Sequence, residues 1–198
     1  MSKLIWASIM LTCLTISSMA EVVPGALQLP DPDCLIALSA VSSPVPNFEA
    51  FHEKSVWNNK PAEVDLKSDP EASRFRTVLS EGAKRGPNFA GHYTIVGWGC
   101  GTSCLNLALV DAKSGKVNFL TALGVLSEMY VDPSADHDVG INDEFLGLRF
   151  RRDSSLLVVL GSTSGSGRGD GISFYQWTGV DLKLLTFVPR SEACRREH

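Results

Sequence analysis

Short runs of apolar and β-branched residues, separated by turn residues, fill the second half of the chain. The first run covers residues 92–98. Three pairs of runs follow, each pair joined by a short polar turn: 105–111 with 116–120 around 112–115, 146–152 with 156–160 around 153–155, and 172–178 with 182–188 around 179–181. Runs of this length joined by Gly, Asp and Ser are typical of β-hairpins. The pattern therefore predicts an antiparallel β-meander.

A helical pattern precedes these strands, at residues 69–85. Its apolar and small residues recur at spacings of three and four: Ala72, Phe75, Val78, Leu79, Gly82 and Ala83. Ser68 and Glu71 form a capping-box pattern, and Gly86-Pro87 is a typical helix end. We expect an α+β fold, in which one long helix on the N-terminal side lies with its Phe75 stripe on a curled sheet or half-barrel of about six to seven strands.

The first twenty residues have the pattern of a secretory signal peptide. Lys3 precedes an apolar run at 4–16, and Ser18-Met19-Ala20 supplies the small residues that signal peptidase requires before its cleavage site. No later run is long enough to span a bilayer, so we expect a periplasmic or secreted protein without membrane insertion after signal cleavage. Residues 21–67 carry six prolines and predict an extended wrapping segment, with a brief helix at 33–41. Residues 68–198 then form the α+β domain.

Charge and cysteine content bear on the partners and on the covalent cross-links of the protein. The net charge is −4 and the basic residues are scattered, which argues against nucleic acid as a partner. Four cysteines follow the signal segment, Cys34, Cys100, Cys104 and Cys194, and an even number in an exported chain indicates disulfides. Three connectivities are possible.

We favour the pairs Cys100–Cys104 and Cys34–Cys194. Closing the long ring would stabilise the fold by roughly 5 kcal/mol, against roughly 2 kcal/mol for the five-residue ring. A redox pair or a metal site at Cys100 and Cys104 is the alternative. It is less favoured, because a thioredoxin-like site has two intervening residues and a zinc site needs two further ligands. We therefore predict no metal and no cofactor.

The sequence offers few candidates for catalytic residues or for a metal-binding site. His92 could serve a hydrolase if a hydroxyl such as that of Ser103 and an orienting acid lay beside it, but a lone histidine is more typical of a structural role. The acidic segment 132–144 suggests calcium at first. It fails the spacing of an EF-hand loop, because Gly140 stands where a ligand is needed, so a solvated loop is the simpler interpretation.

Two glycine-rich connections are better candidates for a binding surface. Residues 99–104 include Thr102 and Ser103, and residues 161–171 include Arg168 and Asp170. We expect both connections to lie at the same end of the sheet and to form the recognition surface, because loops on a rigid sheet concentrate binding residues. Trp98 would join this surface if it shared an open face with Trp177, where the two rings could line a glycan or peptide groove.

Several stretches also carry a resemblance. They are DPEASRFR, GPNFAGHYTIVGWGCGTSC, VDAKSGKV, RRDSSLLVVLG and FYQWTGVDLKLL, over roughly the last two thirds of the chain. Together they resemble a family of uncharacterised exported bacterial proteins that share the GPNFAGHYTIVxWGCGTSC block. The resemblance implies export and supplies no activity or catalytic residue. We expect a binding or inhibitory module of the bacterial envelope whose partner is a protein or a polar envelope ligand; a periplasmic hydrolase using His92 is the alternative.

Overall fold

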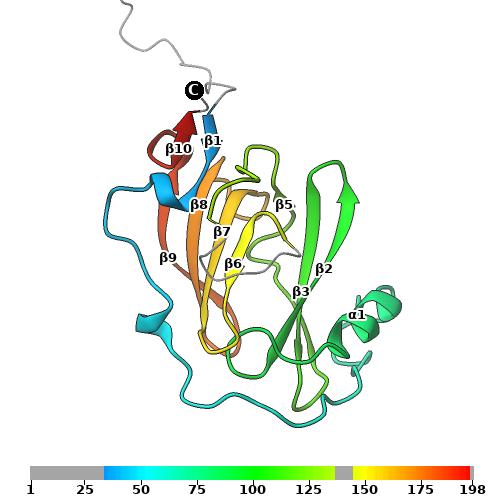
Figure 1. Cartoon of the computed structure of the whole chain (residues 1–198). Helices are drawn as coiled ribbons and strands as arrows, with labels where there is room; N and C mark the ends of the chain where they lie inside the picture. The colour runs from blue at the N-terminus through cyan, green and yellow to red at the C-terminus, as the bar shows by residue number, and fades with distance from the viewer. Residues whose placement is uncertain (1–33, 137–144, 197–198) are drawn as a thin grey trace, which may run out of the picture.

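The computed structural model describes residues 34–136 and 145–196, and within them it shows a mostly antiparallel β-sheet with one α-helix. The main sheet follows the order β2-β3-β5-β7-β8-β9 (Figure 1). Its strands are β2 (Tyr93–Gly101), β3 (Cys104–Asp111), β5 (Leu126–Ser127), β7 (Leu156–Thr163), β8 (Gly171–Trp177) and β9 (Leu182–Pro189). Strand β4 (Val117–Phe119) pairs with β3, and β6 (Leu148–Phe150) pairs with β7. Because β2 and β9 each pair on one side only, the sheet is not closed.

The three predicted hairpins are present. Strands β3 and β4, β6 and β7, and β8 and β9 pair antiparallel around the expected turns. The first turn depends on its glycine: Gly115 has φ +78°, and a Cβ at this position would collide with the carbonyl oxygen of Glu63. A local turn joins each of these pairs, so the sequence pattern was sufficient to predict them.

Strand β5 joins the two halves of the sheet, which we call the β2 half (β2, β3, β4) and the β9 half (β6, β7, β8, β9). It is only two residues long, yet it pairs with β3 on one side and with β7 on the other. One hydrophobic core contains side chains from both halves, among them Ile95, Leu109, Leu157 and Tyr175. The inner faces of the two halves therefore share one core.

The outer face of the β2 half is covered by α1 (Arg76–Ala83). The predicted stripe is confirmed, because Ala72, Leu79 and Ala83 pack in one cluster with Val96 and other residues of the sheet. The helix approaches the strand closely: a Cβ on Gly82 would lie 2.7 Å from both methyl carbons of Val96. This contact lets the helix lie directly on the strand.

The predicted helix was too long at its N-terminal end. The structure shows an α-helix of eight residues, and residues 69–75 form consecutive turns with hydrogen bonds such as Ala72 N–H to Asp69 O at 3.1 Å. Ser68 does not cap a helix. Its hydroxyl donates to the carbonyl of Asp65 at 2.6 Å and accepts from the N–H of Val117 at 2.9 Å, so this side chain ties the turns to β4.

The outer face of the β9 half is covered by the N-terminal segment, which Figure 1 shows in blue and cyan. Phe48 packs with Leu156, Phe174 and Val188 in this cluster. The brief helix predicted at 33–41 is wrong. Residues Cys34–Ile36 form strand β1 and Leu38–Ala40 a single 3-10 turn, because β1 pairs with the distant strand β10 (Cys194–Arg196).

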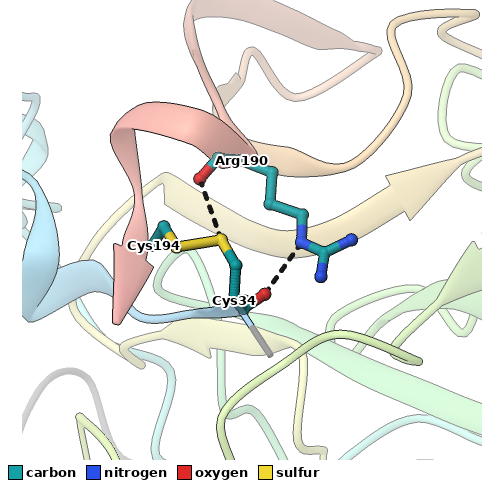
Figure 2. The surroundings of a disulfide bond; sticks show 3 residues. All are labelled: Cys34, Arg190 and Cys194. Atoms are coloured by element: carbon teal, nitrogen blue, oxygen red, sulfur yellow. Dashed lines mark hydrogen bonds between the residues drawn. A yellow bond between two sulfur atoms is a disulfide. The ribbon is translucent and has the colours of Figure 1, made fainter. Parts of the chain in front are cut away.

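Both predicted disulfides are present. Cys100 and Cys104 are bonded across the β2–β3 turn, and Cys34 is bonded to Cys194 across the β1–β10 pair, with Cα atoms 5.2 Å apart. Arg190 lies against this second disulfide (Figure 2), where its Nε donates to the carbonyl of Cys34 at 2.8 Å. The guanidinium also stacks on the Tyr130 ring at 3.7 Å. The long-range disulfide thus lies in a buried, well-packed corner.

Candidate functional site

One row of strand pairing links the strands that adjoin the two glycine-rich connections. Cys104 at the start of β3 is opposite Ser127 of β5, and Ser127 is opposite Ser162 of β7. Adjacent strands are about 4.8 Å apart, so roughly 10 Å separates the backbones of β3 and β7 along this row. We call the surface formed by residues 101–103, 124–129 and 164–170 the loop end.

The loops of the loop end contact one another closely. The N–H of Val125 donates to the Ser164 hydroxyl at 2.8 Å, and the N–H of Ser164 donates to the carbonyl of Val125 at 2.9 Å. A Cβ on Gly165 would lie 2.6 Å from the carbonyl oxygen of Ala122. These contacts fix the β7–β8 connection against residues 122–125.

The β2–β3 turn is fixed by two restraints. The Cys100–Cys104 disulfide closes it, and the N–H of Glu128 donates to the carbonyl of Ser103 at 3.1 Å. The backbone of Ser103 has φ +51°, a conformation that residues other than glycine seldom adopt. Thr102 and Ser103 are both exposed, so the turn presents two hydroxyl-bearing residues on a restrained backbone.

The β7–β8 connection presents a charged side chain. Arg168 is exposed, and its N–H donates to the Ser166 hydroxyl at 3.3 Å. Asp170 is half-buried, and its carbonyl accepts from the N–H of Arg190 at 3.0 Å. This last bond joins the loop end to the corner that holds the Cys34–Cys194 disulfide.

Sequence reasoning missed two apolar residues of the loop end. Val125 is 36 % exposed and Met129 is 59 % exposed. Both flank β5, and Met129 follows the residue that hydrogen-bonds to Ser103. The sequence gives little signal for this exposure, because the buried Leu126 stands between Val125 and the polar pair Ser127-Glu128. Exposed apolar side chains beside polar loops are common at protein interaction sites.

The structure places Trp98 elsewhere. Its ring lies 4.6 Å from Phe75 and packs edge-on against Phe119, so it belongs to the cluster beneath α1. Trp177 lies in the inner core instead, in edge contact with Tyr93 at 5.3 Å. The two tryptophans therefore share no open face, and the condition for a glycan or peptide groove between them is not met. Side chains of successive strand residues alternate between faces, which put Trp98 on the helix side.

His92 lies at the opposite end of the hairpin from Ser103. Strand β2 is nine residues long, which corresponds to roughly 30 Å. His92 is half-buried beside Asp111, with 3.9 Å between Nε2 and Oδ1, longer than a hydrogen bond. Burial, together with the Lys113 ammonium, holds the pKa of His92 below its ordinary value, against the opposite influence of Asp111 and Glu53. A His92–Ser103 pair is not formed.

Two carboxylates of the acidic segment are described, and both serve the fold. Asp132 is buried and accepts from the N–H and the hydroxyl of Ser134 at 2.8 and 2.7 Å. Asp136 accepts from the N–H groups of Leu38 and Ser39. The rest of the segment proposed for calcium, including Gly140, lies outside the described residues. Within the described ranges, no three His, Cys, Asp or Glu side chains are close enough to hold a metal ion.

Comparisons with protein-family models, with curated proteins and with solved structures found no match. The described part of the chain contains no helix that is long and apolar enough to cross a membrane. Two disulfides fit a protein that matures in an oxidising environment.

Proposed function

We propose that this chain is an exported bacterial envelope protein that acts as a binding or inhibitory module through its loop end. The main support is the strand row that joins Cys104, Ser127 and Ser162, because it links the strands next to both loops. In this proposal residues 1–20 are a signal peptide and the protein works in the periplasm or outside the cell. The sheet is curled as a half-barrel, and the chain belongs to the exported family that it resembles.

The chemistry of the loop end supports a macromolecular partner. Val125 and Met129 supply apolar contact area, while Thr102, Ser103 and Arg168 supply hydrogen-bond donors around it. An apolar centre with a polar rim is the usual composition of a protein interface. The disulfide and the contacts between the loops reduce the ordering cost of binding.

The alternative, a periplasmic hydrolase using His92, has weaker support. Its acid partner, Asp111, already accepts hydrogen bonds from the N–H of Lys113 and the hydroxyl of Ser114, at 2.8 Å each. Ser103, the nucleophile considered for it, lies at the other end of β2. The loop end therefore remains the better candidate site.

The proposal is tested by capturing partners from an envelope extract with the disulfide-bonded protein. A variant that combines Thr102→Ala, Arg168→Ala and Met129→Ala should lose at least tenfold of the captured partner. A control variant that combines Lys113→Ala, Val180→Ala and Lys183→Ala changes exposed side chains on other turns and strands and should capture as well as the wild type. Equal capture by the wild type and the loop-end variant would refute the proposal.

A further inference from the structure

A concave surface lies on the helix side of the molecule. It is a groove of about 510 Å³ between α1 and residues 60–66. Its lining is mainly apolar, with Pro61, Ala62, Val64, Leu66 and Ala83. Ligand grooves in proteins commonly have volumes of 300 to 1,000 Å³, so this one is large enough for a small molecule.

Both walls of the groove are fixed to the sheet. On one side, the N–H of Ala62 donates to the carbonyl of Ala112 at 2.9 Å, and the N–H of Asp65 donates to the carbonyl of Gly115 at 2.8 Å. On the other side, α1 packs on β2 through Leu79. The groove is therefore formed before any ligand arrives.

The two ends of the groove differ in character, because the wall segment runs antiparallel to α1. Pro61 lies near Gly86, just after the end of the helix: its Cγ is 3.8 Å from the Cβ position of that glycine. Leu66 lies near the beginning of the helix, where its carbonyl accepts from the Ser73 hydroxyl at 3.3 Å. Lys60 and Lys84 consequently lie at the same end, and Leu66 lies at the other.

The cationic end lacks a fixed counter-charge. Lys60 and Lys84 are exposed, and no described carboxylate lies within 4.0 Å of either ammonium. Glu63 is the one acidic residue that lines the groove. Two ammonium groups at one end and a row of apolar side chains leading away from them match an elongated ligand with an anionic head.

We propose that this groove binds a free fatty acid, with its carboxylate between Lys60 and Lys84 and its acyl chain along Val64 and Leu66. The carboxylate would interact favourably with two unpaired ammonium groups. The chain would remove apolar surface from water on both sides of the groove. A neutral or cationic amphiphile of the same length would gain only the second contribution.

Laurate, used below its micellar concentration in calorimetric titrations of the disulfide-bonded protein, is the appropriate probe. We expect one laurate per chain, bound at least tenfold more tightly than dodecanol or dodecyltrimethylammonium. The Lys60→Gln/Lys84→Gln variant should weaken laurate binding at least tenfold, and Glu63→Gln should tighten it. Lys67→Gln removes a lysine charge just beyond the groove and should leave the affinity unchanged.

A steric variant tests the position of the chain independently of charge. Ser80 lines the groove from α1, so Ser80→Leu should fill the space and abolish laurate binding while thermal unfolding shows that the protein is folded. Absence of laurate binding to the wild type would overturn the proposal. So would equal affinity for the cationic amphiphile, an affinity unaffected by the double lysine change, or binding to anionic phospholipid vesicles without binding to free laurate. These results are independent of partner capture at the loop end.

Discussion

The two outer faces of the sheet are covered in different ways. On the β2 half, α1 forms its own backbone hydrogen bonds and contributes Leu79 and Ala83, while the preceding turns contribute Ala72. A helix used in this way needs only shape complementarity with the strands beneath it. Here that complementarity depends on Gly82, which lets the helix approach Val96.

The cover of the β9 half is less regular and obtains several of its hydrogen bonds from side chains elsewhere in the chain. The Ser154 hydroxyl lies 3.0 and 3.2 Å from the carbonyl oxygens of Phe48 and Phe51. The carboxylate of Asp136 accepts from two N–H groups of the 3-10 turn Leu38–Ala40 and its neighbourhood. Buried backbone groups must find partners, so a cover without regular structure needs side chains and a covalent link to stay in place. The two covers should therefore respond to different changes.

Removing the long-range disulfide should have the largest effect. The double change Cys34→Ala/Cys194→Ala should lower the free energy of unfolding by roughly 5 kcal/mol, because the bond closes a ring over a separation of 160 residues. The control Cys100→Ala/Cys104→Ala should lower it by roughly 2 kcal/mol. Urea unfolding gives both values.

Hydrogen exchange would locate the effect of that first change. Amide protection should fall first in β1 and in residues 47–51, while α1 keeps its protection. An equal loss of protection in α1 would show that the two covers are not independent.

The change Gly82→Ala in α1, which covers the β2 half, should have a smaller effect on the free energy of unfolding. Alanine favours a helix over glycine by about 1 kcal/mol, but its methyl group would collide with Val96, and overpacking costs about 1–3 kcal/mol. We expect a net destabilisation of about 1 kcal/mol by urea unfolding. In a Val96→Ala background the same change should become stabilising, and Glu81→Ala on the exposed helix face should be nearly neutral. Stabilisation by Gly82→Ala in the wild-type background would contradict the close contact.

Acid should weaken the irregular cover through Asp132, with an effect at neutral pH about as small as that of Gly82→Ala and smaller still in acid. Burial alone would raise the pKa of Asp132, but hydrogen bonds from Ser134 and the charge of Arg195 hold it below its ordinary value. The folded state therefore favours the carboxylate, so its contribution is present at neutral pH and is lost as the pH falls through the lowered pKa. Asp132→Asn should cost about 1 kcal/mol at pH 7 and progressively less toward pH 3. A difference between the two proteins that does not change with pH would argue against this role.

Local signals explain which parts of the fold the sequence could predict. The hairpins were predictable because each turn, such as the one at Gly115, lies between two strands that pair with each other. Strand β1 was not, because its partner is the distant strand β10: the favoured Cys34–Cys194 bond indicated that the two segments meet, but not that they pair as strands. The same limit applies to Ser68, whose capping pattern is local but whose hydroxyl is used by Val117.

The same distinction between local and long-range signals applies to the candidate site. The two loops were predictable from the strands that they connect, whereas their link through β5 and the exposure of Val125 and Met129 were not. Two residues are too few to show a strand pattern in a sequence. Trp98 was a candidate for the recognition surface because the sequence shows an aromatic residue next to a glycine-rich loop. The sequence does not show that the Phe75 ring packs against it.

The pairing of β1 with β10 also constrains the order in which the chain can fold. A polypeptide emerges N-terminus first, so Phe48 is made long before the strands β7, β8 and β9 that it covers. Contacts between distant residues form late, because the intervening chain must first lose its freedom. The β2–β3 hairpin and its small disulfide ring can form early. The N-terminal segment docks later, and until then its phenylalanine side chains are exposed to water. During that interval the newly made protein is most exposed to aggregation and to proteolysis, and a holdase chaperone that covers residues 45–51 would protect it.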